Sequence, residues 1–416
     1  MEPEYELFNK ILSTAVEAGA SDVHIKVDAP VVFRINRQLI AIECPTPNEE
    51  WMNKVVRKIV PPHAVQRLEE DREIDFSYYL PGIGRFRTNI YQQRGTFAIA
   101  MRYVKTKVPS FESLGLPPVI KKIAEEPRGI VLVAGTTGCG KSTTLAAMIE
   151  HINENFKKHI ITLEDPIEYV FEDNQSIIEQ REIGLDTKTF ATGLKNMLRQ
   201  DPDVIMIGEM RDSTSFQAAM SAADTGHLVL STIHTTNAAQ SIGRILDFFP
   251  SEEREQVRRQ LAATLCAVIC QRMVTTVQGT VTPAVEILIN TPIVKKLLEE
   301  NRLEKISVAI ETGADEGMQT FNQHLLQLVK EGKVTEEEAL TKASNPEALK
   351  MNLRGIFLSE GQEYWVNPLS HSKWTSYQLN LSANKNGGFL SRRFRFNPSQ
   401  FYQETISIEG GFFNIL

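Results

Sequence analysis

The sequence predicts an α/β fold in which a smaller α+β domain precedes a domain built on a mostly parallel β-sheet. Two patterns support this prediction. After about residue 108, short apolar runs such as IVLVAG, VIMIG and HLVLST alternate with stretches of helical periodicity, which is the order expected of βα units. Before that point, strand-like alternation follows one helical pattern. With 416 residues, the chain is long enough for about two or three domains with cores of their own.

The composition is typical of a soluble folded protein. Hydrophobic residues make up 42% and charged residues 23% of the chain, close to globular averages, which excludes a wholly disordered or fibrous protein. The formal net charge of -7 works against a dominant nucleic-acid-binding surface, so no nucleic-acid partner is expected. A local basic channel within this acidic total would still be compatible with the charge.

The sequence gives no indication of export or of a membrane span. No apolar stretch reaches the ~18 residues that cross a bilayer, and the start, MEPEYELFNK, is acidic where a signal peptide would be basic. The four cysteines are scattered, and they are expected to be reduced. The expected compartment is therefore the cytoplasm.

Residues 1–107 are expected to form the α+β domain. Apolar residues at helical spacing within residues 5–19 predict a first helix, and SDVHIKVDAPVVFRINRQL then alternates like strands around a turn. The segments REIDFSYYL and GRFRTNIYQQRGTFAIAMRYV continue the alternation and predict further paired strands. Residues 105–113, KTKVPSFES, have the character of a linker.

Residues 108–350 are expected to form the parallel-sheet domain with a helical C-terminal region. From residue 251 to about 349 the pattern predicts almost only helices, most clearly in EEREQVRRQLAATLCAVIC, PIVKKLLEE and EEEALTKA. These helices would pack against the sheet.

Residues 351–416 are expected to form an aromatic-rich extension with strand-like runs. They contain 12 of the 32 aromatic residues of the chain, and KNGG predicts a turn between two of the runs. So many aromatic side chains favour burial over a flexible tail. The extension would either fold as a small β-meander or dock on the rest of the chain or on a partner.

The stretch GTTGCGKS, residues 135–142, matches the phosphate-loop pattern G-x-x-x-x-G-K-[ST]. It follows the strand-like IVLVA and opens the helical TTLAAMIEHI, a context that an accidental glycine-rich turn would lack. Loop N–H groups would surround the phosphates, Lys141 would hold the β- and γ-phosphates, and the Ser142 hydroxyl would ligate Mg²⁺. The sequence thus predicts that ATP and Mg²⁺ are bound by Thr137, Gly138, Cys139, Gly140, Lys141, Ser142 and Thr143.

Two acidic segments follow predicted strands downstream of this loop. In DPDVIMIGEMRD, the run VIMI delivers Glu209 to the carboxyl end of a buried strand, a position that suits an acid near Mg²⁺. In TLEDPIEYVF, Glu164, Asp165 and Glu168 all follow the strand HIITL, and position alone does not choose among them. A single acid after a strand is more often a helix cap or a solvated charge, whereas several beside one phosphate loop favour catalysis.

Two histidines flank the run LVLSTI in TGHLVLSTIHTTNAAQ, so His227 and His234 are expected at opposite ends of one strand. A lone histidine is usually structural. A histidine at a strand end beside a phosphate site can instead contact the γ-phosphate or position water. Both interpretations stay open at this point.

Together these segments resemble the secretion ATPase superfamily, which powers type II secretion and type IV pili, and most closely its pilus retraction branch of PilT and PilU proteins. Four stretches carry the resemblance over roughly residues 5–350: GTTGCGKST, the aspartate box ITLEDPIEYVF, the Walker B stretch RQDPDVIMIGEMRD and the histidine box TGHLVLSTIHTTNA. His227 and His234 match the pair of the histidine box, and by this match His227 is expected to bind the nucleotide. The resemblance implies a PAS-like N-terminal domain, a RecA-like P-loop ATPase domain, six chains to a ring, and ATP held between the domains.

The resemblance also implies catalytic roles for single residues. Glu168 matches the glutamate that activates water, and Glu209 matches the atypical Walker B acid near magnesium. In GRFRTNIYQQRGTFAIAMR, Arg87 and Arg102 match the arginines that reach the γ-phosphate. Such arginines neutralise charge that develops during phosphoryl transfer. His234 completes the set of catalytic candidates.

Departures from the family pattern indicate the branch. Assembly-type pilus ATPases and type II secretion ATPases generally carry a further N-terminal domain and a four-cysteine zinc element, and neither is expected here. Where PilT-like motors have an AIRNLIRE-like helix, residues 292–300 read PIVKKLLEE, which is closer to PilU. GMQTFNQHL, residues 317–325, also matches retraction proteins, whereas no counterpart of residues 351–416 is recognised in the family.

The implied function is a hexameric ATPase that powers type IV pilus retraction and twitching motility from the cytoplasm, acting at the inner membrane on a pilus platform protein. One alternative is an accessory PilU-like subunit that depends on a paralogous PilT-like ATPase. Another is a pilus assembly or type II secretion ATPase. A nucleic-acid motor would need a basic, aromatic-lined channel, but residues 351–416 carry six Lys or Arg against four Asp or Glu.

Overall fold

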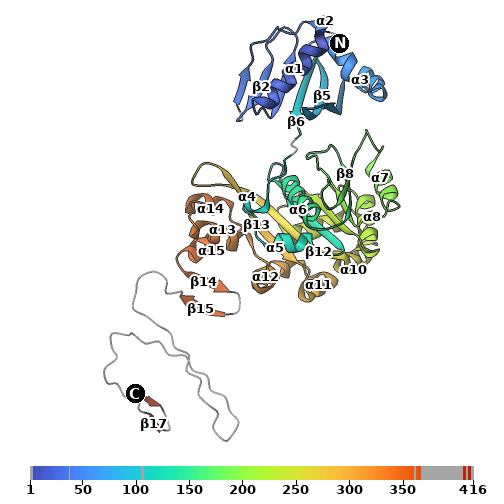
Figure 1. Ribbon diagram of the computed structural model, residues 1–416. Coiled ribbons are helices and arrows are strands. Elements are labelled where there is room, and N and C mark those ends of the chain that lie inside the picture. The colour runs from blue at the N-terminus through green and yellow to red at the C-terminus, as the bar shows by residue number, and fades with distance from the viewer. Residues whose placement is uncertain are drawn as a thin grey trace.

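The computed structural model of the protein describes residues 3–36, 38–104, 107–359, 362–366, 406–408 and 411–413 (Figure 1). Two large β-sheets organise the described chain. The first lies in the N-terminal part, drawn in blue in Figure 1, and the second in the larger part, drawn from green to orange.

The N-terminal sheet is antiparallel, and its described strands follow the order β3-β2-β1-β6-β5-β4. Its strands arise from alternation: in β4, Ile74, Phe76 and Tyr78 are buried and every second residue between them is not. The strands are β1 (Asp22–Lys26), β2 (Val32–Ile35), β3 (Gln38–Ala41), β4 (Glu73–Leu80), β5 (Gly84–Gln93) and β6 (Thr96–Tyr103).

Helices α1 (Pro3–Glu17), α2 (Glu49–Ile59) and α3 (Val65–Asp71) accompany this sheet, with a short 3-10 turn at Pro62–Ala64. Their apolar faces and the apolar side of the strands form one core, whose largest members include Phe8, Leu12, Met52, Phe86 and Ile90. The polar residues of β4 and β5 are left on the opposite side of the sheet.

The second sheet has the order β13-β12-β7-β11-β10-β8-β9 among the described residues. Its strands run parallel except at one edge, where β13 is antiparallel to β12. The strands are β7 (Gly129–Gly135), β8 (His159–Glu164), β9 (Ile177–Glu182), β10 (Val204–Ile207), β11 (Leu228–Ile233), β12 (Leu265–Thr275) and β13 (Val281–Ile289). The parallel strands therefore end at one shared edge, where α/β sheets bind ligands.

Helices cover both faces of this sheet. Alternate residues of the central strand β7 therefore belong to two different hydrophobic cores. Ile130 and Leu132 pack on the side of α8, α9 and α10, whereas Val131 and Val133 pack on the side of α5 and α6. The helices of this part are α4 (Phe111–Leu114), α5 (Val119–Ala124), α6 (Lys141–Asn155), α7 (Phe190–Met197), α8 (Ser213–Asp224), α9 (Ala238–Asp247) and α10 (Arg254–Thr264).

The expectation of helices throughout residues 251–349 is wrong at residues 265–289, which form the strands β12 and β13. Helix α10 ends at Thr264, and β12 continues between β7 and β13 with Val268 and Ile269 fully buried. A continuous apolar run fits a buried strand as well as a buried helix, so periodicity alone did not separate the two. The missed signal is the QGT turn, where Gly279 has a φ of +77°.

The described helices after β13 begin with a side-chain cap except α12, and α12 and α13 contact β13. Thr291, Thr335 and Asn345 each accept a hydrogen bond from an N–H of the helix that follows, and Thr320 forms a capping box with Gln323. These helices are α11 (Pro292–Glu299), α12 (Ile306–Thr312), α13 (Phe321–Lys330), α14 (Glu336–Lys342) and α15 (Pro346–Leu353), with 3-10 turns at Leu303–Lys305 and Ala314–Glu316.

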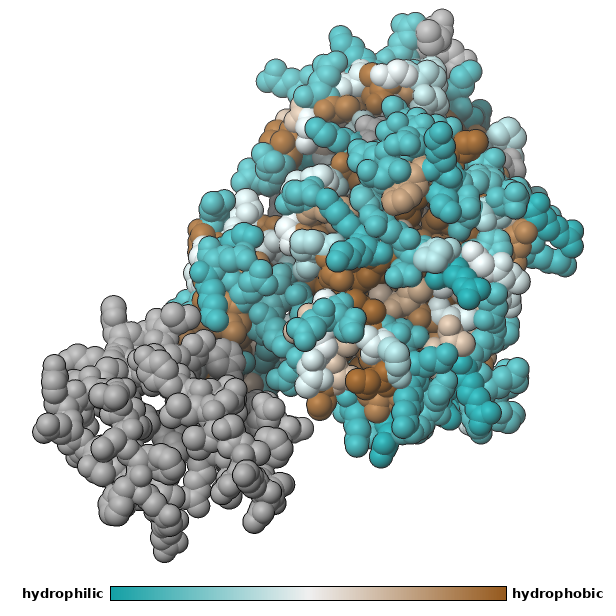
Figure 2. Space-filling view, turned by 60° about the horizontal axis from the view of Figure 1, so that its bottom comes forward, coloured by the Kyte–Doolittle hydropathy of each residue, from teal (hydrophilic) through white to brown (hydrophobic). Residues whose placement is uncertain are grey.

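Two short antiparallel hairpins follow, β14 (Ile356–Ser359) with β15 (Gln362–Val366) and β16 (Ile406–Ile408) with β17 (Gly411–Phe413). The turn expected at KNGG and most of the aromatic residues of the extension lie outside the described residues. None of the described helices has the length and apolar content needed to cross a membrane. On the face shown in Figure 2, hydrophilic side chains predominate and hydrophobic ones lie in separate patches.

Candidate functional site

A cavity of about 600 Å³ lies at the carboxyl edge of the parallel sheet, between that edge and the N-terminal domain. Most of the predicted site residues line it: Arg87, Arg102, Thr137, Gly138, Gly140, Lys141, Ser142, Thr143, Glu168, Glu209 and His234. Residues from both domains therefore line one cavity. Apolar side chains, including Leu145, Phe171 and Phe190, complete the wall.

The phosphate loop connects β7 to α6 and depends on glycine at two positions. Gly140 precedes the first residue of α6 with a φ of 89°, in the left-handed region. A Cβ on Gly135 would lie 2.3 Å from the Sγ of Cys139 and 2.7 Å from the carbonyl oxygen of Gln271. The Cys139 side chain is thus packed beneath Gly135 and does not line the cavity, so the part predicted for this residue falls to its backbone N–H.

The side chain of Lys141 is held in place by backbone carbonyl groups of the phosphate loop. Its buried ammonium group donates to the carbonyl oxygens of Gly135 at 3.0 Å and Thr136 at 3.1 Å. The first turn of α6 is fixed from two sides, because Gln271 donates to the Thr144 hydroxyl at 2.8 Å and Thr143 lies 3.0 Å from the Tyr169 hydroxyl. The loop therefore presents a cation and a helix N-terminus to the cavity, which is a site for an anion.

The aspartate-box loop places two glutamates in different surroundings. Glu164, the last residue of β8, is buried and accepts from the Thr162 hydroxyl at 2.7 Å and from the Glu168 N–H at 3.3 Å. Burial raises the pKa of Glu164 to about 7, although its hydrogen bonds act in the opposite direction. Glu168 is exposed and faces the cavity.

Glu209 follows β10 and lies within a small charged cluster. One of its carboxylate oxygens accepts from Arg211 at 2.6 Å, and the other lies 3.4 Å from Nε2 of His234. The hydrogen bond to Glu209 raises the pKa of Arg211 above its usual value. Arg211 lines the cavity and was not predicted from the sequence, although its place two residues after Glu209 in GEMRD was a visible signal.

The two predicted histidines are not brought together. His234 follows the carboxyl end of β11 and lines the cavity, whereas His227 precedes the amino end of the same strand. Six residues of extended strand separate them, which corresponds to about 20 Å. His227 instead contacts the Ala222 carbonyl oxygen at 2.8 Å, so the structure corrects its assignment as a cofactor-binding residue of this cavity.

The N-terminal domain contributes a row of side chains that crosses its sheet. The register pairs Asp22 with Arg102, Arg102 with Arg87, and Arg87 with Ser77. Residues paired in this way lie on the same face, here the face away from the core. Asp22 accepts from Arg102 at 2.8 Å and lies 3.3 Å from Arg34.

The side chains around the phosphate loop fit Mg²⁺ bound together with a nucleotide. The described residues contain no group of three His, Cys, Asp or Glu that could hold a metal alone. Ser142 and Glu209 both line the cavity and offer a hydroxyl and a carboxylate. Mg²⁺ typically takes one or two such protein ligands and completes its shell with phosphate oxygens and water.

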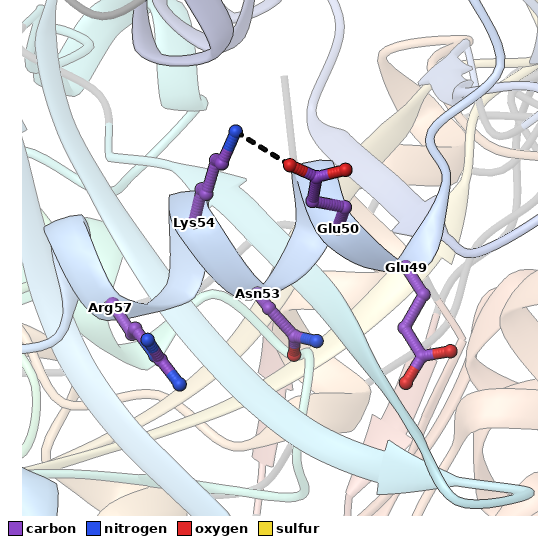
Figure 3. Close-up of a pocket in the computed structure, with 5 residues that line it drawn as sticks. All are labelled: Glu49, Glu50, Asn53, Lys54 and Arg57. Atoms are coloured by element: carbon purple, nitrogen blue, oxygen red, sulfur yellow. Dashed lines mark ion pairs between the residues drawn. The ribbon is translucent and has the colours of Figure 1, made fainter.

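A second hollow of about 440 Å³ lies on the surface of α2, lined by Glu49, Glu50, Asn53, Lys54 and Arg57. Figure 3 shows these side chains spread along the helix, with Lys54 directed toward Glu50. Lys54 also contacts Glu4 of α1 at 2.9 Å. Ion pairs spaced four residues apart on a helix stabilise it slightly, and nothing here resembles a catalytic arrangement.

Comparison with known proteins agrees with this architecture. The family model of the type II/IV secretion system protein matches residues 1–353. The chain is 40% identical over 338 residues to the type IV pilus retraction ATPase PilT of Pseudomonas aeruginosa, an alignment that covers 81% of this chain and 98% of that protein. It is 38% identical over 348 residues to the type IV pilus ATPase PilU of the same organism, covering 83% of this chain and 91% of PilU.

A solved structure also matches. The crystal structure of the pilus retraction motor PilT with bound ADP has a TM-score of 0.76 and 41% identity, and the match covers 82% of this chain and 98% of that one. The predicted fold class, an α/β ATPase domain with a mostly parallel sheet and a smaller N-terminal domain, is confirmed. The chain belongs to the type II/IV secretion system protein family and, within it, to the PilT/PilU family of secretion ATPases.

Proposed function

We propose that the chain is an ATP hydrolase that works as a hexameric motor and powers the retraction of type IV pili. The observation that carries the proposal is the single cavity in which a phosphate loop, two acidic loops and two arginines of another domain meet. Phosphoryl transfer relies mainly on positioning and charge stabilisation, and these are the parts that supply both. The similarity to PilT supports the pilus context.

ATP would bind at the phosphate loop. The N–H groups around Thr137, Gly138, Cys139 and Gly140 would donate to the phosphates, with the N-terminus of α6 behind them. Lys141 would exchange its contacts to backbone carbonyl oxygens for the β- and γ-phosphates. Ser142 and Glu209 would hold Mg²⁺, which offsets the charge of the phosphate oxygens.

Glu168 would act as the general base. Its carboxylate would accept a proton from the water that attacks the γ-phosphorus, while the bond to the bridging oxygen breaks and ADP leaves. Glu209 is less suited to this step, because Arg211 and His234 already contact its two oxygens. His234 would orient the water or the γ-phosphate.

Arg87 and Arg102 would neutralise the charge that develops on the transferred phosphoryl group. Because they belong to the N-terminal domain, the complete site requires that domain to be docked over the cavity. We propose residues 1–107, 108–350 and 351–416 as the functional divisions of the chain. Movement of the first against the second during the ATP cycle would be the mechanical output, and a ring of six chains would apply it to the platform protein at the cytoplasmic side of the inner membrane.

A second candidate is an accessory role in which the chain works only with a paralogous PilT-like ATPase. The chain is about as similar to PilU as to PilT, and the sequence of α11, PIVKKLLE, favours the PilU side. An assembly or secretion ATPase is the third candidate, and it has no observation of this kind in its favour.

Purified full-length protein with Mg²⁺ and ATP tests the enzyme. We expect steady phosphate release that Lys141→Ala abolishes along with tight nucleotide binding, because the main cation facing the β- and γ-phosphates is lost. Lys195→Ala, on the exposed side of α7, is the matched control and should behave as wild type. Wild-type turnover in Lys141→Ala would contradict the site.

Deletion of the gene tests the pilus role. A retraction motor should restore twitching to a strain that lacks both this chain and its paralogue, whereas an accessory subunit should restore it only when the paralogue is present. Unchanged pilus number and twitching after deletion would contradict both roles.

A further inference from the structure

One buried carboxylate joins the two domains. Glu182 is the last residue of β9, and its side chain is 4% exposed. Its Oε2 atom accepts from the Ser77 hydroxyl at 2.6 Å and lies 3.6 Å from an Arg85 guanidinium nitrogen. The same oxygen accepts from the Ile167 N–H at 3.3 Å. A single atom thus touches two residues of the N-terminal sheet and the backbone beside Glu168.

On the ATPase side, this contact fixes the loop that carries Glu168. The N–H of Ile167 is bound by Glu182, and the next N–H, that of Glu168, is bound by Glu164 at 3.3 Å. Glu164 and Glu182 are register partners of β8 and β9, so both carboxyl groups come from one end of the sheet. Two successive backbone groups are therefore tied to buried acids, which sets the direction in which Glu168 leaves the loop.

On the N-terminal side, the same contact sets the position of the two arginines of the cavity. Ser77 is the register partner of Arg87, and Arg87 is the partner of Arg102. Arg85 lies two residues before Arg87 on β5, so both side chains leave the strand on the same face. When Ser77 and Arg85 are seated on Glu182, the face that carries Arg87 and Arg102 is held over the cavity.

We propose that Glu182 is a positioning residue that makes the placement of Glu168 depend on docking of the N-terminal domain. With the domain docked, Oε2 of Glu182 has three partners, the loop at Ile167 is fixed, and Arg87 and Arg102 line the cavity together. When the domain moves away, Glu182 loses both of its N-terminal partners. Water then replaces Ser77 and Arg85 around the uncovered carboxylate, so the side chain is no longer held in one position and its hydrogen bond to the Ile167 N–H weakens. The inference rests on the proposed ATPase function. It adds that docking of the N-terminal domain places Glu168 and the two arginines at the cavity together.

Full-length Arg85→Ala and Ser77→Ala test the proposal, because neither residue lines the cavity. We expect each to lower kcat by about tenfold, since a hydrogen bond to a charged group is usually worth at least that factor. KM for ATP and affinity for ADP should change less than about twofold, because the contacts of the phosphate loop remain. Arg85→Lys should recover most of the loss.

The control is Lys158→Ala, which removes a more exposed ion pair, 3.3 Å from Asp203, at the other end of β8. It should keep wild-type turnover. Combining Arg85→Ala with Glu182→Gln should cost little more than the worse single variant, because both changes break one contact. Independent, multiplying losses would show that the effect of Arg85 does not pass through Glu182 and would overturn the proposal, as would unchanged kcat in both N-terminal variants.

Hydrogen exchange separates this proposal from the proposed function. In Arg85→Ala, the backbone amides of residues 167–169 should exchange faster than in wild type, while those of β7 stay unchanged. This measurement needs no turnover. A wild-type protein without ATPase activity would refute the proposed function alone, whereas equal exchange of the loop in wild type and Arg85→Ala would refute the coupling alone.

Discussion

The three glutamates around the cavity differ in what surrounds each carboxyl group. Glu164 is buried, and burial raises its pKa to about 7. The carboxylate oxygens of Glu209 contact two neighbouring side chains, Arg211 at 2.6 Å and His234 at 3.4 Å. Glu168 is exposed on its loop, so its carboxylate is accessible to water. These surroundings favour Glu168 as the base.

Substitution of the two candidate acids separates their roles. Glu168→Gln should still bind ATP but hydrolyse it at least ~100-fold more slowly, because a positioned base typically contributes 10²–10⁴-fold. Glu209→Gln should instead change the dependence of turnover on magnesium concentration. Glu172→Gln, an exposed acid four residues after Glu168, is the control and should behave as wild type. A magnesium dependence altered only in Glu168→Gln would mean that the roles are reversed.

Local sequence pattern predicts which residues come near a phosphate but not where every side chain points. The loop spacing was sufficient for Lys141 and Ser142, because the pattern itself defines a backbone shape. It could not predict that Cys139 turns inward, since this depends on the space that Gly135 leaves beneath the loop. His227 could have been excluded, because it precedes its strand and ligands bind where parallel strands end.

At the level of elements, the sequence predicted those strands of the parallel-sheet domain that end in a polar motif. It did not predict the buried strands β12 and β13, which have no such motif. β7, β8, β10 and β11 were visible as apolar runs that end in the phosphate loop and in the aspartate-box, Walker B and histidine-box segments. β12 and β13 lie at the other side of β7 and carry no such motif. Their pairing with β7 depends on contacts far apart in the sequence, which no local period records.

Helix α13 is attached to β13 by a histidine, and this predicts a pH dependence of stability. Nδ1 of the buried His324 accepts the N–H of Val285 at 2.9 Å, and burial lowers the pKa of His324 from 6.5 to about 4. The folded state therefore binds the proton less readily than the unfolded state. The stabilisation is complete above about pH 6.5 and is lost as the pH falls toward 4, by about 3 kcal/mol in total.

Denaturant unfolding at several pH values measures this effect. His324→Asn keeps an acceptor near the same place and does not titrate, so the loss of stability between pH 6.5 and 4 should become smaller. His324→Ala leaves the Val285 N–H without a partner and should lower stability at every pH by about 1–3 kcal/mol. An unchanged pH slope in His324→Asn would show that another group causes the dependence.

At the scale of the whole molecule, the proposed site is complete only when both domains contribute. Arg87 and Arg102 were predicted from their resemblance to family arginines, and they line the cavity together with the phosphate loop. The contact that seats them, between Ser77 and Glu182, joins residues 105 positions apart and leaves no pattern in the sequence. The role predicted for the aromatic extension stays a prediction, since most of it lies outside the described residues.

Steady-state turnover and ADP affinity, measured together on Arg87→Ala and Arg102→Ala, test most directly the central claim that the two domains share one catalytic site. We predict that each change lowers kcat strongly and leaves ADP affinity nearly intact, because the missing contact is to the transferred phosphoryl group. Arg67→Ala, an exposed arginine of α3, is the control, and melting temperatures verify folding of Arg102→Ala, which also releases Asp22. Wild-type kcat in both variants, or a loss of ADP binding equal to the loss of kcat, would contradict the account.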